Sequence, residues 1–133
     1  MESSLPDLLS AVNDGRVLTP EIFGSIDFDE VLEAREGEEK FDTEWNRCLA
    51  MLEKEWSDRE INPAIEEMVD EVREQTFEVA SANTDQHDLA NHISDDFDLF
   101  ARAIVLEMTD PFLESLWENY ENGEIPSPAS IME

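Results

Sequence analysis

Residues 93–108 read ISDDFDLFARAIVLEM, and they form the only long segment whose apolar residues cover more than one face of a helix. Those that recur at three- and four-residue spacing, or fill in beside them, are Phe97, Leu99, Phe100, Ala101, Ala103, Ile104, Val105 and Leu106. A helix that is apolar on most sides needs burial on most sides. We therefore expect this segment to be the central helix of a small bundle.

Start and stop signals divide the rest of the chain into further helices. Asn62-Pro63 and Thr109-Asp110-Pro111 each combine a capping residue with a first-turn proline, and Gly123 ends the last amphipathic segment. The inward stripe after Pro63 is expected to be Ile65, Met68, Val69, Val72, Thr76 and Val79. No stretch alternates as a strand does. The sequence predicts an all-α single domain of five to seven helices over residues 1–123, followed by an extended tail at 124–133.

The charge is strongly one-sided. There are 35 acidic and 8 basic residues, which gives a net charge of −27. Hydrophobic residues make up 41% of the chain, too much apolar material for a disordered acidic segment. Such a folded surface repels nucleic acid and anionic membranes and attracts basic proteins. We expect a basic protein partner, such as a toxin, a nuclease or a nucleic-acid-binding protein, and no direct binding to nucleic acid or membrane.

The single cysteine and the N-terminal residues bear on the compartment. One cysteine, Cys48, excludes an intramolecular disulfide, and its helical spacing between Trp45 and Leu52 indicates a core position. The N-terminus lacks the residue order of a signal peptide, and no apolar run approaches a membrane span. These features predict a cytoplasmic protein.

Catalytic and metal-binding patterns are weak. His87 and His92 are five residues apart, which places them on different faces of a helix, and no HExxH pattern occurs. The four glycines are isolated, so no phosphate-binding loop is formed. With 35 acids, a pair of carboxylates has no specificity as an acid–base signal. We expect no catalytic residues, no metal and no cofactor, and we interpret the protein as a non-enzyme.

A row of carboxylates after Pro63 is the main candidate site. Its members are Glu66, Glu67, Asp70, Glu71, Glu74 and Glu78. They make four like-charge pairs at four-residue spacing, a repulsion on the order of 1 to 2 kcal/mol, and only Arg73 lies nearby to relieve it. Uncompensated repulsion predicts a partner-binding face. A solvated face and adaptation to high salt are the plain alternatives, although 22 Glu against 13 Asp is not the balance expected of a salt-adapted surface.

Two uses of this face remain open. Carboxylates on successive helical turns lie roughly 5 to 6 Å apart, close to the separation of successive phosphates, so the face can imitate a nucleic-acid backbone. Alternatively, its field can steer a basic partner that a few buried anchors then hold. Phe77 and Tyr120 are candidate anchors, although an aromatic residue in such a position is more often part of the core.

In size, acidity, helical content and absence of catalytic motifs, the chain resembles the small cytoplasmic immunity proteins that neutralise bacterial antagonism toxins. Residues 94–126, with SDDFDLFARAIVL followed by TDPFLESLWENYENGEIP, are similar to a C-terminal helical pair in such proteins. The resemblance implies one-to-one binding of a cognate toxin, by occlusion of its active site or substrate groove. It assigns no residues.

The leading hypothesis is therefore an acidic, non-enzymatic inhibitor of a basic partner, most simply an immunity protein. The alternatives are a DNA mimic of the phage or plasmid anti-restriction or anti-CRISPR type, an acidic secretion chaperone, and a small enzyme of unknown type. The oligomeric state stays open, because no sequence feature separates a monomer from a dimer.

Overall fold

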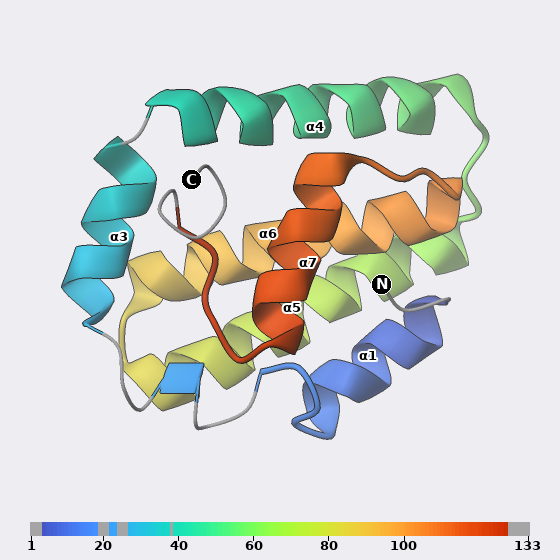
Figure 1. Cartoon of the computed structure of the whole chain (residues 1–133). Coiled ribbons are helices and arrows are strands. Elements are labelled where there is room, and N and C mark those ends of the chain that lie inside the picture. Colours follow the sequence, from blue (N-terminus) through green and yellow to red (C-terminus); the bar gives the residue numbers. More distant parts are fainter. Residues whose placement is uncertain (1–3, 19–21, 24–26, 38, 128–133) are drawn as a thin grey trace.

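The computed structural model describes residues 4–18, 22–23, 27–37 and 39–127, and all regular structure in those ranges is helical (Figure 1). The helices are α1 (Leu5–Asn13), α3 (Phe28–Gly37), α4 (Glu39–Asp58), α5 (Pro63–Thr84), α6 (His87–Leu106) and α7 (Pro111–Glu121). The prediction of an all-α bundle of five to seven helices is confirmed.

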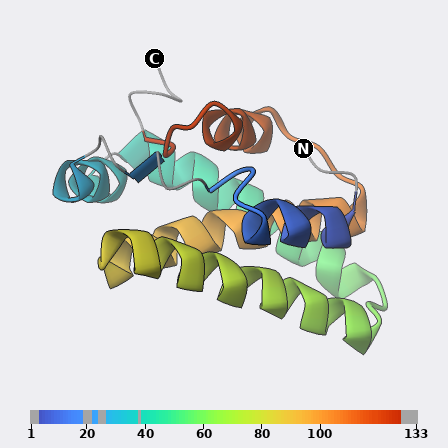
Figure 2. The same ribbon diagram turned by 90° about the horizontal axis from the view of Figure 1, so that it is seen from below.

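Helix α6 is the centre of this bundle and contains most of the stretch that predicted it. It contacts α1, α3, α4, α5 and α7. Figure 2 shows α5 and α7 on opposite sides of it. It is continuous from His87 to Leu106, without a break at Ser94. Although α6 is largely buried, neither it nor any other helix in the described ranges is long and apolar enough to cross a membrane.

Helices α5 and α7 begin with side-chain caps at the residues that the sequence indicated. The Asn62 side-chain oxygen accepts a hydrogen bond from the backbone N–H of Ala64 at 2.9 Å, and Asp110 accepts one from Phe112 at 2.9 Å. A proline follows each cap in the first turn, where its missing N–H leaves no hydrogen bond unmade. At the other end of α5, Asp85 takes a left-handed conformation with φ +53°. The chain can therefore reverse directly into α6.

An aromatic cluster joins α6 to α7. The rings of Phe97 and Tyr120 lie 5.0 Å apart, and those of Phe100 and Trp117 lie 5.2 Å apart, all in edge-to-face arrangements. Tyr120 is 1% exposed. Of the two interpretations of Tyr120, the core position is confirmed and the surface anchor is wrong, because α7 directs this side chain into the core against α6.

The inward stripe of α5 begins later than the sequence indicated. Its buried residues are Val69, Val72, Thr76, Ala80 and Thr84. Ile65 is 37% exposed, so its assignment to the inner stripe is wrong. Burial along α5 starts only at Val69, which leaves the first turn of the helix outside the core.

Candidate functional site

The six carboxylates predicted as the partner-binding set lie together on one side of α5, and we call them the acidic face of α5. All six side chains are exposed. At about 100° per residue they span roughly 140° of the helix circumference, and they face away from Val69, Val72 and Thr76. Among the residues that the structure describes, none of the six takes part in an ion pair. The acidic face therefore keeps its charge uncompensated.

Arg73 does not neutralise its own helix in the way that the sequence indicated. One of its guanidinium nitrogens lies 2.7 Å from Asp95 on α6, and the other lies 3.6 Å from Asp98 on the same helix. Because Asp98 is almost fully buried, its burial raises its pKa, and Arg73 and Arg102 act against that rise. The positive charge of Arg73 is thus paired with carboxylates across the α5–α6 seam and not with a member of the acidic face.

The other paired arginines follow the same pattern. The arginines at positions 35, 47, 59, 73 and 102 all form ion pairs with carboxylates on α4, on α6 or at the start of α7. None of these pairs includes a member of the acidic face. These five arginines therefore link helices or neutralise carboxylates outside the acidic face, and the acidic face keeps its negative charge.

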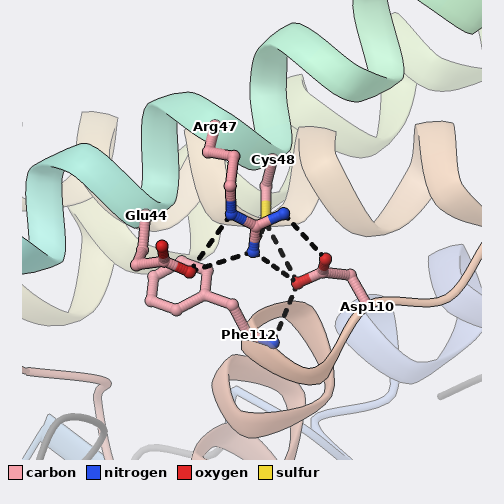
Figure 3. Close-up of polar contacts among 5 residues, drawn as sticks. All are labelled: Glu44, Arg47, Cys48, Asp110 and Phe112. Carbon is pink, nitrogen blue, oxygen red and sulfur yellow. Dashed lines mark hydrogen bonds and ion pairs between the residues drawn. The ribbon is translucent and has the colours of Figure 1, made fainter.

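One such link holds α4 against the start of α7 (Figure 3). The Arg47 guanidinium donates to both oxygens of Asp110, at 3.0 and 3.1 Å, and to Glu44 at 2.9 Å. The Cys48 thiol also donates to Asp110, at 3.3 Å. Hydrogen bonds from Arg47 lower the pKa of Asp110, whereas burial raises the pKa of Cys48 to about 12. The prediction that Cys48 is a core residue is confirmed, since its exposure is 0%.

A second polar centre, which sequence reasoning missed, lies inside the bundle. Asp96 on α6 is 0% exposed and accepts hydrogen bonds from three other helices. The donors are Arg35 of α3 at 2.7 and 2.8 Å, the Trp45 indole of α4 at 2.9 Å, and the Tyr120 hydroxyl of α7 at 2.6 Å. The sequence did contain a signal, because a carboxylate in a helix buried on most sides requires partners.

Two depressions lie along the seam between α5 and α6, and the first of them also reaches Trp56 of α4. One is lined by Trp56, Glu66, Val69, Asp70 and Arg102. The other is lined by Asp70, Arg73, Glu74, Phe77, Asn91 and Ser94. Asp70 belongs to both. The acidic face is thereby divided, since Glu66, Asp70 and Glu74 line the depressions, whereas Glu67, Glu71 and Glu78 line neither.

The two histidines lie in different surroundings. The His87 ring packs 6.0 Å from the ring of Phe77, and His92 Nε2 lies 3.3 Å from a carboxylate oxygen of Glu36. Within the described ranges, no group of three or more His, Cys, Asp or Glu side chains is placed to hold a metal ion.

The chain also matches a known protein family. A family model described as immunity protein PIM1 matches residues 7–127, a range that runs from within α1 to beyond α7. No curated protein matches the chain. The family match therefore covers the acidic face, the buried Asp96 centre and the contact between α4 and α7. This chain belongs to the family of immunity protein PIM1.

Proposed function

We propose that this protein neutralises a bacterial toxin by binding it without catalysis, and that the acidic face of α5 contacts a basic surface of that toxin. Membership of an immunity protein family supports a toxin as the partner. The observation that carries the proposed binding face is its charge: six exposed carboxylates without an ion pair in the described part of the chain. The resulting complex occludes the toxin's active site or substrate groove.

The electrostatics favour rapid capture of a basic partner. A net charge of −27 creates a field that steers cations from a distance, and such steering raises association rates by about 10 to 1,000-fold at low ionic strength. Basic groups arriving at the acidic face also relieve the repulsion between carboxylates one turn apart. Binding therefore gains both rate and free energy from the same six residues.

The test compares two variants that remove the same charge from opposite sides of α6. E67Q/E71Q/E74Q/E78Q removes four carboxylates from the acidic face, whereas E114Q/E118Q/E121Q/E124Q removes four exposed ones from α7 and the residues after it. Figure 2 shows that α5 and α7 lie on opposite sides of α6. Association with the toxin is measured by stopped flow at low salt, and protection is measured by survival of cells that express the toxin.

We expect the α5 variant to slow association about tenfold or more and the α7 variant to slow it only slightly, because steering depends on where the charge lies. Equal rates for the wild-type protein and the α5 variant at low salt would exclude the α5 face. Duplex DNA is added as a competitor in the same assay. Competition by DNA would show that the toxin uses its nucleic-acid groove to bind the inhibitor, whereas its absence would indicate contact elsewhere.

A further inference from the structure

The two depressions along the α5–α6 seam share Asp70 as a lining residue, and together we call them the α5–α6 groove. Each contains one half-buried aromatic side chain, Trp56 in the first and Phe77 in the second. Glu66 and Asp70 line the first depression with Trp56, and Asp70 and Glu74 line the second with Phe77. The groove therefore combines a row of carboxylates with one aromatic side chain in each depression.

The cations that line this groove already have partners. Arg102 donates to Asp98 at 3.0 Å, and its guanidinium lies 5.1 Å from the centre of the Trp56 ring. Arg73 is paired with Asp95 at 2.7 Å. Among the described residues, Glu66, Asp70 and Glu74 form no ion pair, so these three carboxylates are the charges in the groove that remain available.

The spacing of the three carboxylates suits a helical ligand. Positions four residues apart on a helix rise by about 6 Å, and a second helix with basic residues four apart has the same repeat. In an extended segment, side chains on the same face are about 6.6 Å apart, so they fall progressively out of register with the row of carboxylates. Amphipathic helices that lie in grooves also place apolar anchors on the same side, one or two turns apart.

We propose that the α5–α6 groove binds a basic amphipathic helix of the toxin. Its basic side chains pair with Glu66, Asp70 and Glu74, and its apolar side chains pack on Trp56 and Phe77. This inference rests on the proposed function and refines it, because it divides the acidic face into two parts. The groove carboxylates slow dissociation through direct contact, whereas Glu67, Glu71 and Glu78 act through the long-range field on association.

Two double variants separate these roles, because they remove equal charge from the same helix. E66Q/E74Q alters the groove, and E67Q/E71Q alters only the outer part of the face. The probe is a synthetic amphipathic peptide of about 14 residues, roughly four turns, with lysines at four-residue spacing beside leucines. A scrambled peptide of the same composition keeps the charge and loses the apolar stripe. Affinities for the full-length protein are measured by fluorescence anisotropy.

We expect E66Q/E74Q to weaken binding of the amphipathic peptide about tenfold and E67Q/E71Q to weaken it about threefold or less, since only the first pair makes direct contacts. The scrambled peptide is expected to bind the wild-type protein weakly and to respond equally to both pairs. Equal weakening of the amphipathic peptide by both pairs, or equal binding of the two peptides, would overturn the groove proposal.

The toxin experiment keeps this inference separable from the proposed function. If E67Q/E71Q/E74Q/E78Q slows toxin association while the peptides fail to distinguish the two double variants, the α5 face binds the toxin and the groove proposal is wrong. If the peptides do distinguish the pairs but the quadruple variant associates and protects like the wild-type protein, the groove binds a basic helix and the proposed toxin-binding face is wrong.

Discussion

Arg35 on α3 and Asp96 on α6 form a two-point ion pair inside the bundle, with nitrogen–oxygen distances of 2.8 and 2.7 Å. Their side chains are 3% and 0% exposed. The guanidinium also lies 5.2 Å from the centre of the Phe41 ring. Because neither charge is accessible to bulk water, each depends on the other for its solvation. This pair therefore fixes how α3 sits on α6.

Removal of the Asp96 charge should destabilise the fold strongly. Asp96→Asn leaves Arg35 buried without its counter-charge, a change that typically costs about 3 to 5 kcal/mol. Asp95→Asn is the matched control, because Asp95 is the preceding residue but its side chain is 38% exposed, and an exposed pair contributes at most about 1 kcal/mol. Urea unfolding measures both variants. Similar losses of stability would contradict a structural role for the buried pair.

Tyr120 should resist ionisation in the folded protein. Burial and the nearby charge of Asp96 raise the pKa of Tyr120 well above its ordinary value of 10. The stabilisation associated with this shift is complete below pH 10 and is lost as the pH rises above it. As the only tyrosine of the chain, it can be followed by absorbance near 295 nm.

We expect no phenolate signal at pH 10 while the helical circular dichroism is intact, and an ordinary titration in concentrated urea. The matched variant is Tyr120→Phe, which keeps the ring and removes the 2.6 Å hydrogen bond to Asp96. Because bonds to charged groups contribute about 1.5 to 3 kcal/mol, its unfolding free energy should fall by that amount. A phenolate that forms at pH 10 in the folded protein would refute the assignment.

Asp110 should make the stability of the fold depend on pH in the acidic range. Hydrogen bonds from Arg47 lower the pKa of Asp110 in the folded state, and burial opposes this only in part. The stabilisation is therefore complete above the unfolded pKa of about 3.9 and is lost as the pH falls through the folded value. Asp110→Asn keeps a capping side chain but loses the charge, so the wild-type protein should be more stable by about 1 to 2 kcal/mol at pH 7.

That difference between the wild-type protein and Asp110→Asn should shrink as the pH is lowered to 3. Thermal unfolding at several pH values measures this difference. Glu44→Gln is the control, because it removes only the exposed ion pair between Arg47 and Glu44. A difference that is the same at pH 7 and pH 3 would show that Asp110 acts only as a helix cap.

Cys48 should be chemically inert until the protein unfolds. Its thiol is buried, and burial raises its pKa to about 12, so thiolate is scarce at pH 8. We expect iodoacetamide to modify the folded protein on the order of a thousandfold more slowly than the urea-unfolded chain, since the thiolate is the reactive form. Mass spectrometry follows the reaction at the only cysteine. Rapid modification of the native protein would contradict the burial of the Cys48 thiol against Asp110.

The acidic face should lower the stability of the free protein. E67Q/E71Q/E74Q/E78Q removes three of the like-charge pairs at four-residue spacing on α5, and each pair costs a few tenths of a kcal/mol. We therefore expect the variant to be about 1 kcal/mol more stable at low salt. The gain should shrink in about 1 M salt, where charges are screened within roughly 3 Å. A variant less stable than the wild-type protein would mean that these carboxylates make stabilising contacts.

The central helix could be predicted because its apolar pattern is local. Phe97, Phe100 and Ala101 require burial wherever the other helices lie, and caps such as Asn62 and Asp110 act within three residues. The caps of α5 and α7, and the apolar pattern of α6, therefore appear in the structure where the sequence placed them.

Contacts between residues that are far apart in the sequence could not be predicted in the same way. Asp96 and Asp95 are adjacent in the sequence, and their different roles follow from Arg35, which lies 61 residues before Asp96. Whether Tyr120 is a core residue or a surface anchor likewise depends on the rotation of α7 against α6. The partner of Arg73 depended on which neighbouring helix supplied the closer carboxylate. In each case the outcome is decided by packing between helices, which the spacing of residues along one helix does not specify.

The pairing of Arg73 with carboxylates of α6 has a consequence for how freely the acidic face can vary in sequence. Because this arginine joins α5 to α6 and leaves the acidic face unpaired, no ion pair in the described part of the chain connects the outward carboxylates of α5 to the contacts that hold the helices together. Substitutions on that face can accumulate without disturbing the fold. Under the proposed function, a lineage of such proteins can change the toxin it recognises by altering one helix surface, while the buried pair of Arg35 and Asp96 stays as it is.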